Sequence, residues 1–489
     1  PDFFGGCSLF IAELPGGTAL STSLRQLELF AQAVGTPLAR SAEFQAERIM
    51  LGNGGLWPTS FTHVRRLDHM SFVRISGTQV SELAYRAGDQ MLQSSASIEE
   101  ILSAIQADIR ANVRAIAAAA AEHRVGHLTG GFDSRLVLSA ILSEGLQDRF
   151  LFFTSGAVGA TDRIIADGLA RTYHLTRTAD AGLSPAPARN VRDRFLGPMR
   201  ASAGILGAGV TGREPGVPIV TAGGGYGELL RSFFKQRTAT YSRASTPQEV
   251  MARLWPTASS SRICRPAFAA ELAERLSERL AQGASRGVPE HYDLDFFYLS
   301  IRNRYHIGMN AYLWSGVGTR LDPLYSPHLL SLGMRARLED RASNVHGFDL
   351  MDRFSPRLRH HPFDSDRYDA HARTQRPPRL EPLSTDGSIR WGTIPQRRRP
   401  VAPLVVSTPA ERDALVRRAN AMGINFWQLQ WLPVARQALR RALRETADGN
   451  IDSVLNMGYI DHLARGEVRA KSEIRDVYTC LEALLWLSS

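Results

Sequence analysis

Hydrophobic and polar residues alternate in short segments over the first part of the chain. Residues 3–14 (FFGGCSLFIAEL) form a candidate strand, residues 51–64 (LGNGGLWPTSFTHV) are rich in turn formers, and residues 68–77 (DHMSFVRISG) alternate like a half-buried strand. Residues 97–122 then place apolar side chains at helical spacing behind a serine cap, with acids in the first turn. This pattern predicts an N-terminal domain over residues 1–95 and a long helix that opens a second domain, residues 96–489.

Beyond this helix, continuous apolar segments alternate with segments of helical period. We expect strands at residues 125–128, 149–154 and 219–222, and helices at residues 134–144 and 161–173. Apolar strands without alternation, joined by helices, indicate a parallel sheet that is covered on both faces.

The C-terminal half has a different pattern. From about residue 246 onward it is mainly helical and ends in an apolar helix at residues 473–487. Residues 374–403 are rich in Pro, Arg, Ser and Thr and lack an apolar period, so we expect a loop or linker there.

Composition places the chain among ordinary globular proteins. It has 489 residues, of which 44% are hydrophobic and 22% charged, and this length favours two domains. No stretch approaches the roughly 18 apolar residues that span a bilayer. The three cysteines, Cys7, Cys264 and Cys480, have neither metal-ligand nor disulfide spacing. Because residues 1–14 also lack the features of a secretory signal, we expect a cytoplasmic protein that does not bind membranes.

The net charge of +10 comes almost entirely from arginine, since Lys235 and Lys471 are the only lysines. The arginines are dispersed, and the dense run at residues 397–399 has no interleaved aromatic residues that would stack on bases. We therefore expect no nucleic-acid binding. Attraction of an anionic substrate such as ATP, or of an acidic peptide, explains the charge better.

The strongest local signal is the segment of residues 128–135, LTGGFDSR, between a predicted strand and a predicted helix. Gly130 and Gly131 allow close approach of the backbone to an anion, and Thr129 and Ser134 offer hydroxyl groups. A carboxylate at Asp133 is favourable beside that anion only if Mg²⁺ lies between them. The segment lacks the Gly-Lys-Ser/Thr element of a Walker A loop. The alternative is an ordinary strand–turn–helix junction in which Asp133 caps the helix.

Residues 129–134 resemble the SGGxDS pyrophosphate loop of the ATP-pyrophosphatase domain in asparagine synthetases and their relatives, the β-lactam synthetases, carbapenam synthetase and lasso-peptide cyclases. Residues 152–166 are similar to the strand and helix that follow this loop, with Asp162 at the acidic position. Residues 221–233 look like the second loop, GxGxDExF, and residues 304–328 resemble the helix and PFLD element near the acceptor site. More faintly, residues 56–67 are similar to the last strands of the family's glutaminase-type domain.

The resemblance implies an α/β fold: a doubly wound parallel sheet with a helical C-terminal part, preceded by a degenerate glutaminase-like (Ntn-type) α+β domain. It also implies that ATP transfers AMP to a substrate carboxylate, and that an amine attacks the resulting acyl-adenylate. Asp133 and Glu228 would then hold Mg²⁺. The residues expected to contact ATP are Leu128, Thr129, Gly130, Gly131, Asp133, Ser134, Thr154, Gly223, Gly224, Gly225 and Tyr226.

The chain departs from the family pattern in its candidate nucleophile for glutamine hydrolysis. Family glutaminases use an N-terminal cysteine, whereas the printed sequence begins with Pro1 and its nearest cysteine, Cys7, lies in an apolar pattern that predicts packing. We therefore expect no glutaminase activity. The attacking amine then belongs to the substrate itself or to a second substrate.

The second departure concerns the metal ligands. Gly227 stands where the family has an aspartate, and Glu228 follows it. Glu228 either reaches the metal with its longer side chain or only caps the next helix, in which case activity is altered or lost.

The third departure is the shortage of lysines, one of which often stabilises the acyl-adenylate in this family. Lys235 and Lys471 are the only lysine candidates, and for each a role as an ordinary surface residue is the favoured interpretation. Arg135 or Arg231 are alternatives, because a guanidinium keeps its charge and binds phosphate with two nitrogens.

We thus expect an ATP- and Mg²⁺-dependent amide ligase that forms a lactam or macrolactam on a peptide or metabolite precursor, such as a lasso peptide, with a partner protein possible for its delivery. The alternatives are ammonia-dependent amidation of a small carboxylate or sugar acid, and a nucleotide-binding pseudoenzyme. No HExxH motif is present, and the adjacent His360 and His361 are interpreted as structural.

Overall fold

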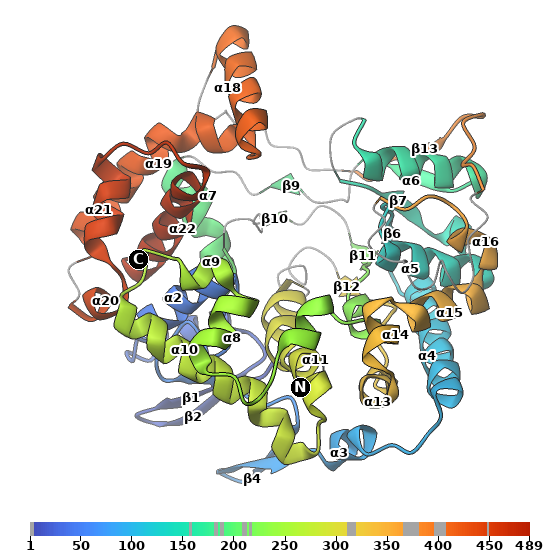
Figure 1. Ribbon diagram of the computed structural model, residues 1–489, viewed down its shortest axis with the longest axis horizontal. Coiled ribbons are helices and arrows are strands. Elements are labelled where there is room, and N and C mark those ends of the chain that lie inside the picture. The colour runs from blue at the N-terminus through green and yellow to red at the C-terminus, as the bar shows by residue number, and fades with distance from the viewer. Residues whose placement is uncertain are drawn as a thin grey trace.

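The computed structural model describes residues 4–155, 159–179, 184–185, 190–207, 213–214, 218–310, 319–364, 381–395, 407–446 and 449–489. The fold is α/β, with a six-stranded parallel sheet and many helices (Figure 1). In the described part of the chain, no helix combines the length and apolarity needed to cross a bilayer.

The sheet is parallel throughout, as predicted from its continuous apolar strands. Its spatial order is β12-β11-β6-β7-β8-β13. The strands are β6 (His123–His127), β7 (Leu151–Phe153), β8 (Thr176–Thr178), β11 (Ile219–Ala222), β12 (Thr319–Leu321) and β13 (Arg390–Gly392).

The order of the strands reverses beside β6. From β6 the chain proceeds through β7 to β8 on one side, and then returns to place β11 and β12 on the other side. The boundary between β6 and β11 is therefore a topological switch point, and ligands of such sheets bind in the crevice outside the carboxyl ends of the strands there.

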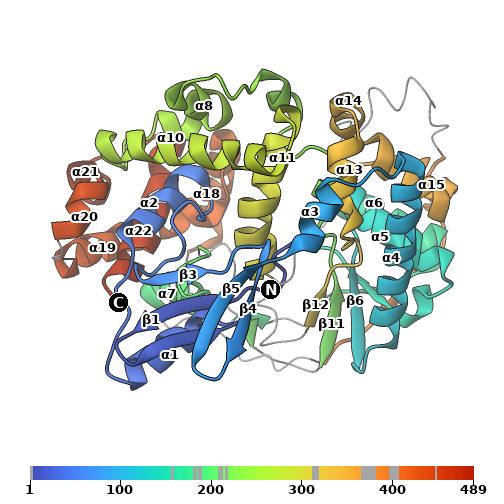
Figure 2. The same cartoon turned by 90° about the horizontal axis from the view of Figure 1, so that it is seen from below.

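Helices α4 (Ile98–Ala118), α5 (Phe132–Ser143) and α15 (Val345–Phe354) pack against one another beside this sheet (Figure 2). Helix α4 confirms the predicted long helix, and Ser97 caps it through a capping box with Glu100. It ends at Ala118, a few residues earlier than predicted. Helix α6 (Thr161–Thr172) confirms the other helix predicted in this region.

The N-terminal region has three antiparallel strands, β1 (Phe10–Leu14), β2 (Gly17–Ser21) and β3 (Val64–Arg66), and a hairpin of β4 (Ser71–Ser76) and β5 (Gln79–Ala84). This confirms the strands predicted within residues 3–14 and 68–77. The helices here are α1 (Leu24–Ala33), α2 (Ala42–Leu51) and α3 (Arg86–Leu92).

The N-terminal region shares its hydrophobic core with the end of the chain. The Phe61 ring lies 5.7 Å from that of Trp486, and Gln45 Nε2 donates a hydrogen bond of 2.8 Å to the carbonyl of Gly204. Helix α2 packs on α20 (Gly449–Val454) and α22 (Lys471–Leu487). The predicted boundary near residue 95 separates two regions of the sequence. In the structure, side chains from both regions fill one continuous hydrophobic core.

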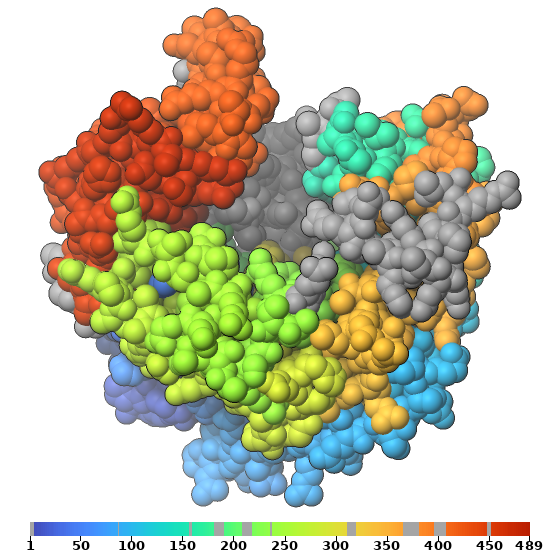
Figure 3. All heavy atoms as spheres, in the orientation of Figure 1, coloured from blue at the N-terminus to red at the C-terminus, as the bar shows by residue number. Residues whose placement is uncertain are grey.

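The C-terminal half is mainly helical, as predicted. Helix α18 stands out from the body of the molecule in Figure 3, and Figure 1 shows the C-terminal helices on the opposite side of the molecule from the sheet. The α-helices not yet named are α7 (Val191–Ala201), α8 (Pro247–Leu254), α9 (Pro256–Ser259), α10 (Pro266–Ala281), α11 (Asp293–Phe297), α13 (His328–Arg335), α14 (Leu338–Ala342), α16 (Pro356–Arg359), α18 (Pro409–Met422), α19 (Phe426–Glu445) and α21 (Met457–Arg465).

The short and irregular elements complete the chain. Helix α11 continues directly into a π-helix, η6 (Tyr298–Gly308), and the two run through the middle of the molecule (Figure 2). The 3₁₀ turns and short strands are η1 (Gln147–Arg149), η2 (Gly227–Leu230), η3 (Lys235–Thr240), η4 (Gln282–Arg286), η5 (Glu290–Tyr292), β9 (Ser184–Pro185) and β10 (Arg213–Glu214).

The described part of the predicted loop or linker, residues 381–395, is a loop apart from β13, which the sequence did not predict. This segment is held by the sheet: β13 pairs with β8, and Ser384 donates its backbone N–H to Thr172 Oγ1 at 3.0 Å. A three-residue edge strand needs no apolar period, which is why the pattern missed it. Residues 374–380 and 396–403 lie outside the described residues. The predicted packing of Cys7 is wrong, because Cys7 is exposed and lies before β1.

Candidate functional site

Two glycine-containing loops meet at the switch point of the sheet. The first follows β6 and leads into α5, and the second, Gly223 to Gly225, follows β11. A Cβ atom built on Gly224 would lie 2.9 Å from Cβ of Asp133, so only glycine allows this approach without a shift. The structure therefore brings together the two loops that the sequence singled out.

The backbone N–H groups of the first loop are bonded within the protein. Thr129 N donates to Ser134 Oγ at 3.1 Å, and Gly131 N donates to Thr129 Oγ1 at 3.0 Å. Gly130 N donates to Asp162 Oδ1 at 2.7 Å, so a carboxylate oxygen occupies the place expected for a phosphate oxygen. These three N–H groups do not face an open anion site. No side chain caps the start of α5, and its N-terminal dipole still favours an anion.

Asp133 and Glu228 share one arginine. Arg231 Nη1 and Nη2 donate to the two carboxylate oxygens of Asp133 at 2.6 and 3.0 Å, and Nη2 also donates to Glu228 Oε1 at 2.8 Å. The Arg231 side chain is only 6% exposed, whereas Asp133 and Glu228 are 26% and 32% exposed. The guanidinium thus lies behind the two carboxylates, and the carboxylates face solvent.

This cluster fits a Mg²⁺ ion that completes its coordination with phosphate oxygens and water. Mg²⁺ sites of that kind use one or two protein carboxylates, and Asp133 and Glu228 supply two. Among the described residues no group of three or more His, Cys, Asp and Glu side chains could enclose a metal, so an all-protein cage is not formed there. Arg231 neutralises one of the two negative charges, which the sequence did not predict.

Any side chain at position 227 would require the Asp133 carboxylate to move. A Cβ atom built on Gly227 would collide with Asp133 Oδ1. Arg231 Nη1 lies 3.4 Å from the Gly227 carbonyl as a hydrogen-bond donor. Gly227 therefore lies against Asp133, and Arg231 contacts both residues.

The second loop is held by a residue that the sequence did not single out. Asp322 Oδ1 accepts a hydrogen bond of 2.9 Å from Gly225 N and another of 3.1 Å from Arg320 Nη2. Its side chain is only 4% exposed. Asp322 directly follows β12, the strand next to β11, and an acid at the carboxyl end of a strand is a signal that could have identified it.

Tyr226 packs in the core. Its ring makes edge contacts with Phe4 at 5.7 Å and Tyr325 at 5.4 Å, and its φ of 69° lies in the left-handed region. These contacts favour a structural role over the predicted contact with ATP.

Arg135 is also structural. Its guanidinium is buried, donates to the carbonyls of His361 at 2.8 Å and Pro362 at 2.5 Å, and stacks 3.7 Å from the centroid of Phe363. Burial lowers the pKa of Arg135 to about 9, and the charge of Asp364 opposes this shift. The arginine holds residues 358–363 in place and does not reach into the crevice as expected for an acyl-adenylate ligand.

Of the four remaining candidates from the sequence, Leu128 and Thr154 lie at the strand ends, and the two lysines lie in other elements. Thr154 Oγ1 donates to the Leu128 carbonyl at 2.5 Å and accepts from Arg177 Nη2 at 2.8 Å, so Leu128 and Thr154 join the ends of β6 and β7. Lys235 begins η3, and its side chain lies outside the described part of the chain. Lys471 begins α22 in the helical C-terminal part, where its Nζ lies close to Gly423.

The structure adds Asp364 to the first loop. Asp364 N donates to the Gly130 carbonyl at 3.0 Å, and among the described residues its buried Oδ1 has no hydrogen-bond partner. More than two hundred residues separate it from the loop, so no local pattern could have predicted it. His361, next to this segment, bonds Tyr173 Oη at 2.9 Å, which confirms its structural interpretation.

Tyr298 closes the site from the π-helix. Its ring stacks on Phe233 at 4.8 Å. Burial raises its pKa, and the nearby charges of Glu228 and Asp133 raise it further. The phenol therefore stays protonated beside the two carboxylates.

No protein-family model matches this chain, and no curated protein matches it either.

Proposed function

We propose that the chain is an ATP- and Mg²⁺-dependent amide ligase that adenylates a substrate carboxylate in the crevice between β6 and β11. The observation that carries this proposal is the meeting of two glycine loops at a switch point, with Asp133 and Glu228 exposed beside it. The strands β8-β7-β6-β11-β12 have the chain order 3-2-1-4-5, which agrees with a doubly wound nucleotide-binding sheet of the ATP-pyrophosphatase type.

In the first step, a carboxylate oxygen of the substrate attacks the α-phosphorus of ATP, and the bond from this phosphorus to the bridging oxygen of the β-phosphate breaks. Asp133 and Glu228 would hold Mg²⁺, which supplies charge neutralisation for the departing pyrophosphate. The N-terminus of α5 and the guanidinium of Arg231 place positive charge on the same side of the crevice.

In the second step, an amine attacks the acyl carbon, loses a proton and expels AMP. We propose an amine of the same substrate, which gives a lactam or macrolactam on a peptide or metabolite precursor such as a lasso peptide. Holding amine and acyl-adenylate together supplies much of the acceleration. In this proposal residues 1–95 derive from a degenerate glutaminase-like domain, and ammonia-dependent amidation of a small carboxylate or sugar acid is the alternative.

A nucleotide-binding pseudoenzyme is the second candidate function, and specific contacts favour it. Arg231 bonds both carboxylates, and the N–H groups of Thr129, Gly130 and Gly131 are already bonded to side chains. Such a protein would bind a nucleotide without cleaving it.

Detection of pyrophosphate and AMP from ATP distinguishes these functions. The purified protein is incubated with Mg²⁺, ATP and candidate peptides carrying a carboxylate and an amine, with and without ammonium. Equimolar AMP and pyrophosphate without ammonium support lactam formation, and products that require ammonium support amidation. ATP binding with no pyrophosphate under any condition supports the pseudoenzyme.

A further inference from the structure

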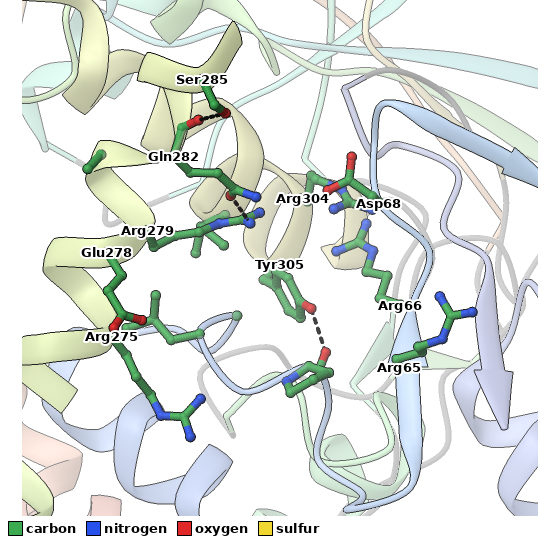
Figure 4. A pocket seen from close by; sticks show the side chains of 15 residues that line it. Arg65, Arg66, Asp68, Arg275, Glu278, Arg279, Gln282, Ser285, Arg304 and Tyr305 are labelled. Atoms are coloured by element: carbon green, nitrogen blue, oxygen red, sulfur yellow. Dashed lines mark hydrogen bonds between the residues drawn. The ribbon is translucent and has the colours of Figure 1, made fainter. Parts of the chain in front are cut away.

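A cavity lies between the N-terminal region, α10 with η4, and the π-helix η6 (Figure 4), and none of its lining residues belongs to the two glycine loops. Its volume is about 640 Å³. Its walls carry five arginines: Arg65, Arg66, Arg275, Arg279 and Arg304. Two acidic residues, Asp68 and Glu278, accompany them, so the lining is strongly basic.

Two of the arginines are paired at the rim. Arg65 lies 2.6 Å from Glu82, and Arg275 lies 2.9 Å from Glu271. These side chains are about half exposed, so their ion pairs contribute little and are easily exchanged for another anion.

The other three arginines surround one aromatic ring. Arg66 Cζ lies 4.7 Å from the centroid of Tyr305, whose hydroxyl donates to the Pro58 carbonyl at 2.5 Å. Burial raises the pKa of Tyr305, while the positive charges of Arg66, Arg304 and Arg279 oppose this rise. In Figure 4, Arg279 lies on one side of Tyr305, and Arg66 and Arg304 lie on the other.

Arg279 has an unused donor at this point. Its Nη1 donates to Gln282 Oε1, but its buried Nε has no hydrogen-bond partner among the described residues. A buried charged donor without a partner costs free energy. The Arg279 side chain also lines the cavity, so its guanidinium charge is available to an anion there.

We propose that this cavity binds a small organic molecule through a phosphate or carboxylate group, with Arg279 as its principal ligand and Arg66 and Arg304 beside it. Guanidinium groups bind both oxyanions through paired hydrogen bonds. Leu56, Pro58 and Ile301 line the same cavity and provide apolar contacts for the organic part of the molecule. The volume lies within the range of about 300–1,000 Å³ that is usual for small-molecule sites.

The site is separate from the proposed ATP crevice, although η6 carries Tyr298 at one and Tyr305 at the other. This inference does not depend on the proposed ligase activity. It holds equally for an enzyme and for a pseudoenzyme.

The test measures the stabilisation of the full chain by inorganic phosphate and by succinate, each titrated at constant ionic strength and followed by thermal unfolding. A ligand that binds only the folded state stabilises it by RT ln(1 + L/Kd), where L is the free ligand concentration, so the Tm rises steadily as the ligand is titrated. We expect at least one of the two anions to raise the Tm of wild type. We also expect Arg279→Gln to reduce the affinity for that anion at least about tenfold. A response to phosphate assigns a phosphate-bearing ligand, and a response to succinate a carboxylate-bearing one.

Two controls separate this site from the crevice and from general charge effects. Arg441→Gln removes an equal charge at an exposed pair on α19, and Arg231→Gln alters the crevice. Both should keep the anion response. If Arg279→Gln does not fold, Arg275→Gln at the rim provides the measurement, with a smaller expected loss. No response of wild type, or an equal response in the folded Arg279 or Arg275 variant, would overturn the proposal.

Discussion

The two oxygens of Asp133 accept hydrogen bonds from two nitrogens of Arg231, at 2.6 and 3.0 Å. Asp133 stands in the first turn of α5, after the loop that follows β6, and Arg231 directly follows η2, after β11. The pair therefore bridges the switch point of the sheet and fixes the two loops relative to each other. It also determines how much negative charge remains for a metal ion.

Replacing Arg231 should convert this bridge into a stronger metal site. In Arg231→Gln, the carboxylates of Asp133 and Glu228 lose their shared cation, and we expect a loss of about 2 kcal/mol in the free energy of unfolding without Mg²⁺. MgCl₂ should then raise the Tm of the variant more than that of wild type, when compared with NaCl of equal ionic strength. Arg441→Gln, at an exposed ion pair, is the control. Equal responses to Mg²⁺ in all three proteins would mean that these carboxylates do not bind the metal.

Glu228→Gln tests the second carboxylate with almost no change in shape. If Glu228 is a metal ligand, adenylation should slow about 100-fold, which corresponds to about 3 kcal/mol, and the Mg²⁺ concentration needed for half-maximal rate should rise. If Glu228 only caps the following turn, the variant should lose about 1 kcal/mol of stability and keep its rate. Activity titrated against Mg²⁺ in both proteins decides between these outcomes.

Arg135→Lys should lower the free energy of unfolding, because Arg135 has a structural role. The buried guanidinium bonds the carbonyls of His361 and Pro362 and stacks on Phe363, and a lysine cannot make this set of contacts. We expect a loss of about 2–4 kcal/mol in unfolding free energy. Faster hydrogen exchange at the Asp364 amide, which is bonded to the Gly130 carbonyl, should accompany it. A stable variant with unchanged exchange would contradict this structural role.

The buried carboxyl of Glu47 should make the stability of the fold depend on pH. Its carboxyl is fully buried and accepts N–H bonds from Leu56 at 2.7 Å and Trp57 at 3.0 Å. Burial raises its pKa from 4.5 to about 8, against the opposing effect of these bonds. Between these values the folded state holds a proton that the unfolded state has lost, so stability falls as pH rises from about 5 to 8.

One such proton lowers the free energy of unfolding by up to about 1.4 kcal/mol for each unit that the pH rises. Urea unfolding of wild type and Glu47→Gln at pH 5, 6.5 and 8 isolates it, because other groups titrate equally in both proteins. The difference in unfolding free energy should change in favour of the variant as pH rises. Parallel pH profiles would show that Glu47 keeps an ordinary pKa.

The sequence predicted the parts of the fold whose signals are local. The continuous apolar segments of β7 and β11, and the capped amphipathic pattern of α4, were enough to place these elements and the parallel sheet. Strands β8, β12 and β13 were not predicted. Each has three residues; β8 reads Thr-Arg-Thr and has no apolar residue, and β12 and β13 are partly exposed and lie at the edges of the sheet. Such strands are defined by their neighbours in the sheet and carry no period of their own.

In the candidate site, too, the residues with a local sequence signal were predicted, and the contacts between distant residues were not. The glycine loops and Asp133 were evident because they lie between a strand and a helix. The bridge through Arg231, the carboxylate of Asp162 on the Gly130 amide and the approach of Asp364 arise from tertiary contacts. Arg135 and Tyr226 were predicted to act in the site, but both are buried. The sequence around an arginine or tyrosine beside a loop does not show whether its side chain packs in the core or faces a ligand.

Binding of ATP in the presence of Mg²⁺, measured by isothermal titration calorimetry, tests the central proposal most directly. Wild type should bind one ATP per chain. Asp133→Ala should weaken this binding at least about 100-fold while the variant remains folded, because the loss of a metal ligand costs about 3 kcal/mol. Asp148→Ala, which removes an exposed acid paired with Arg390, should bind like wild type. If wild type binds no ATP, or if folded Asp133→Ala binds it as tightly as wild type, the crevice between β6 and β11 is not a Mg²⁺–ATP site.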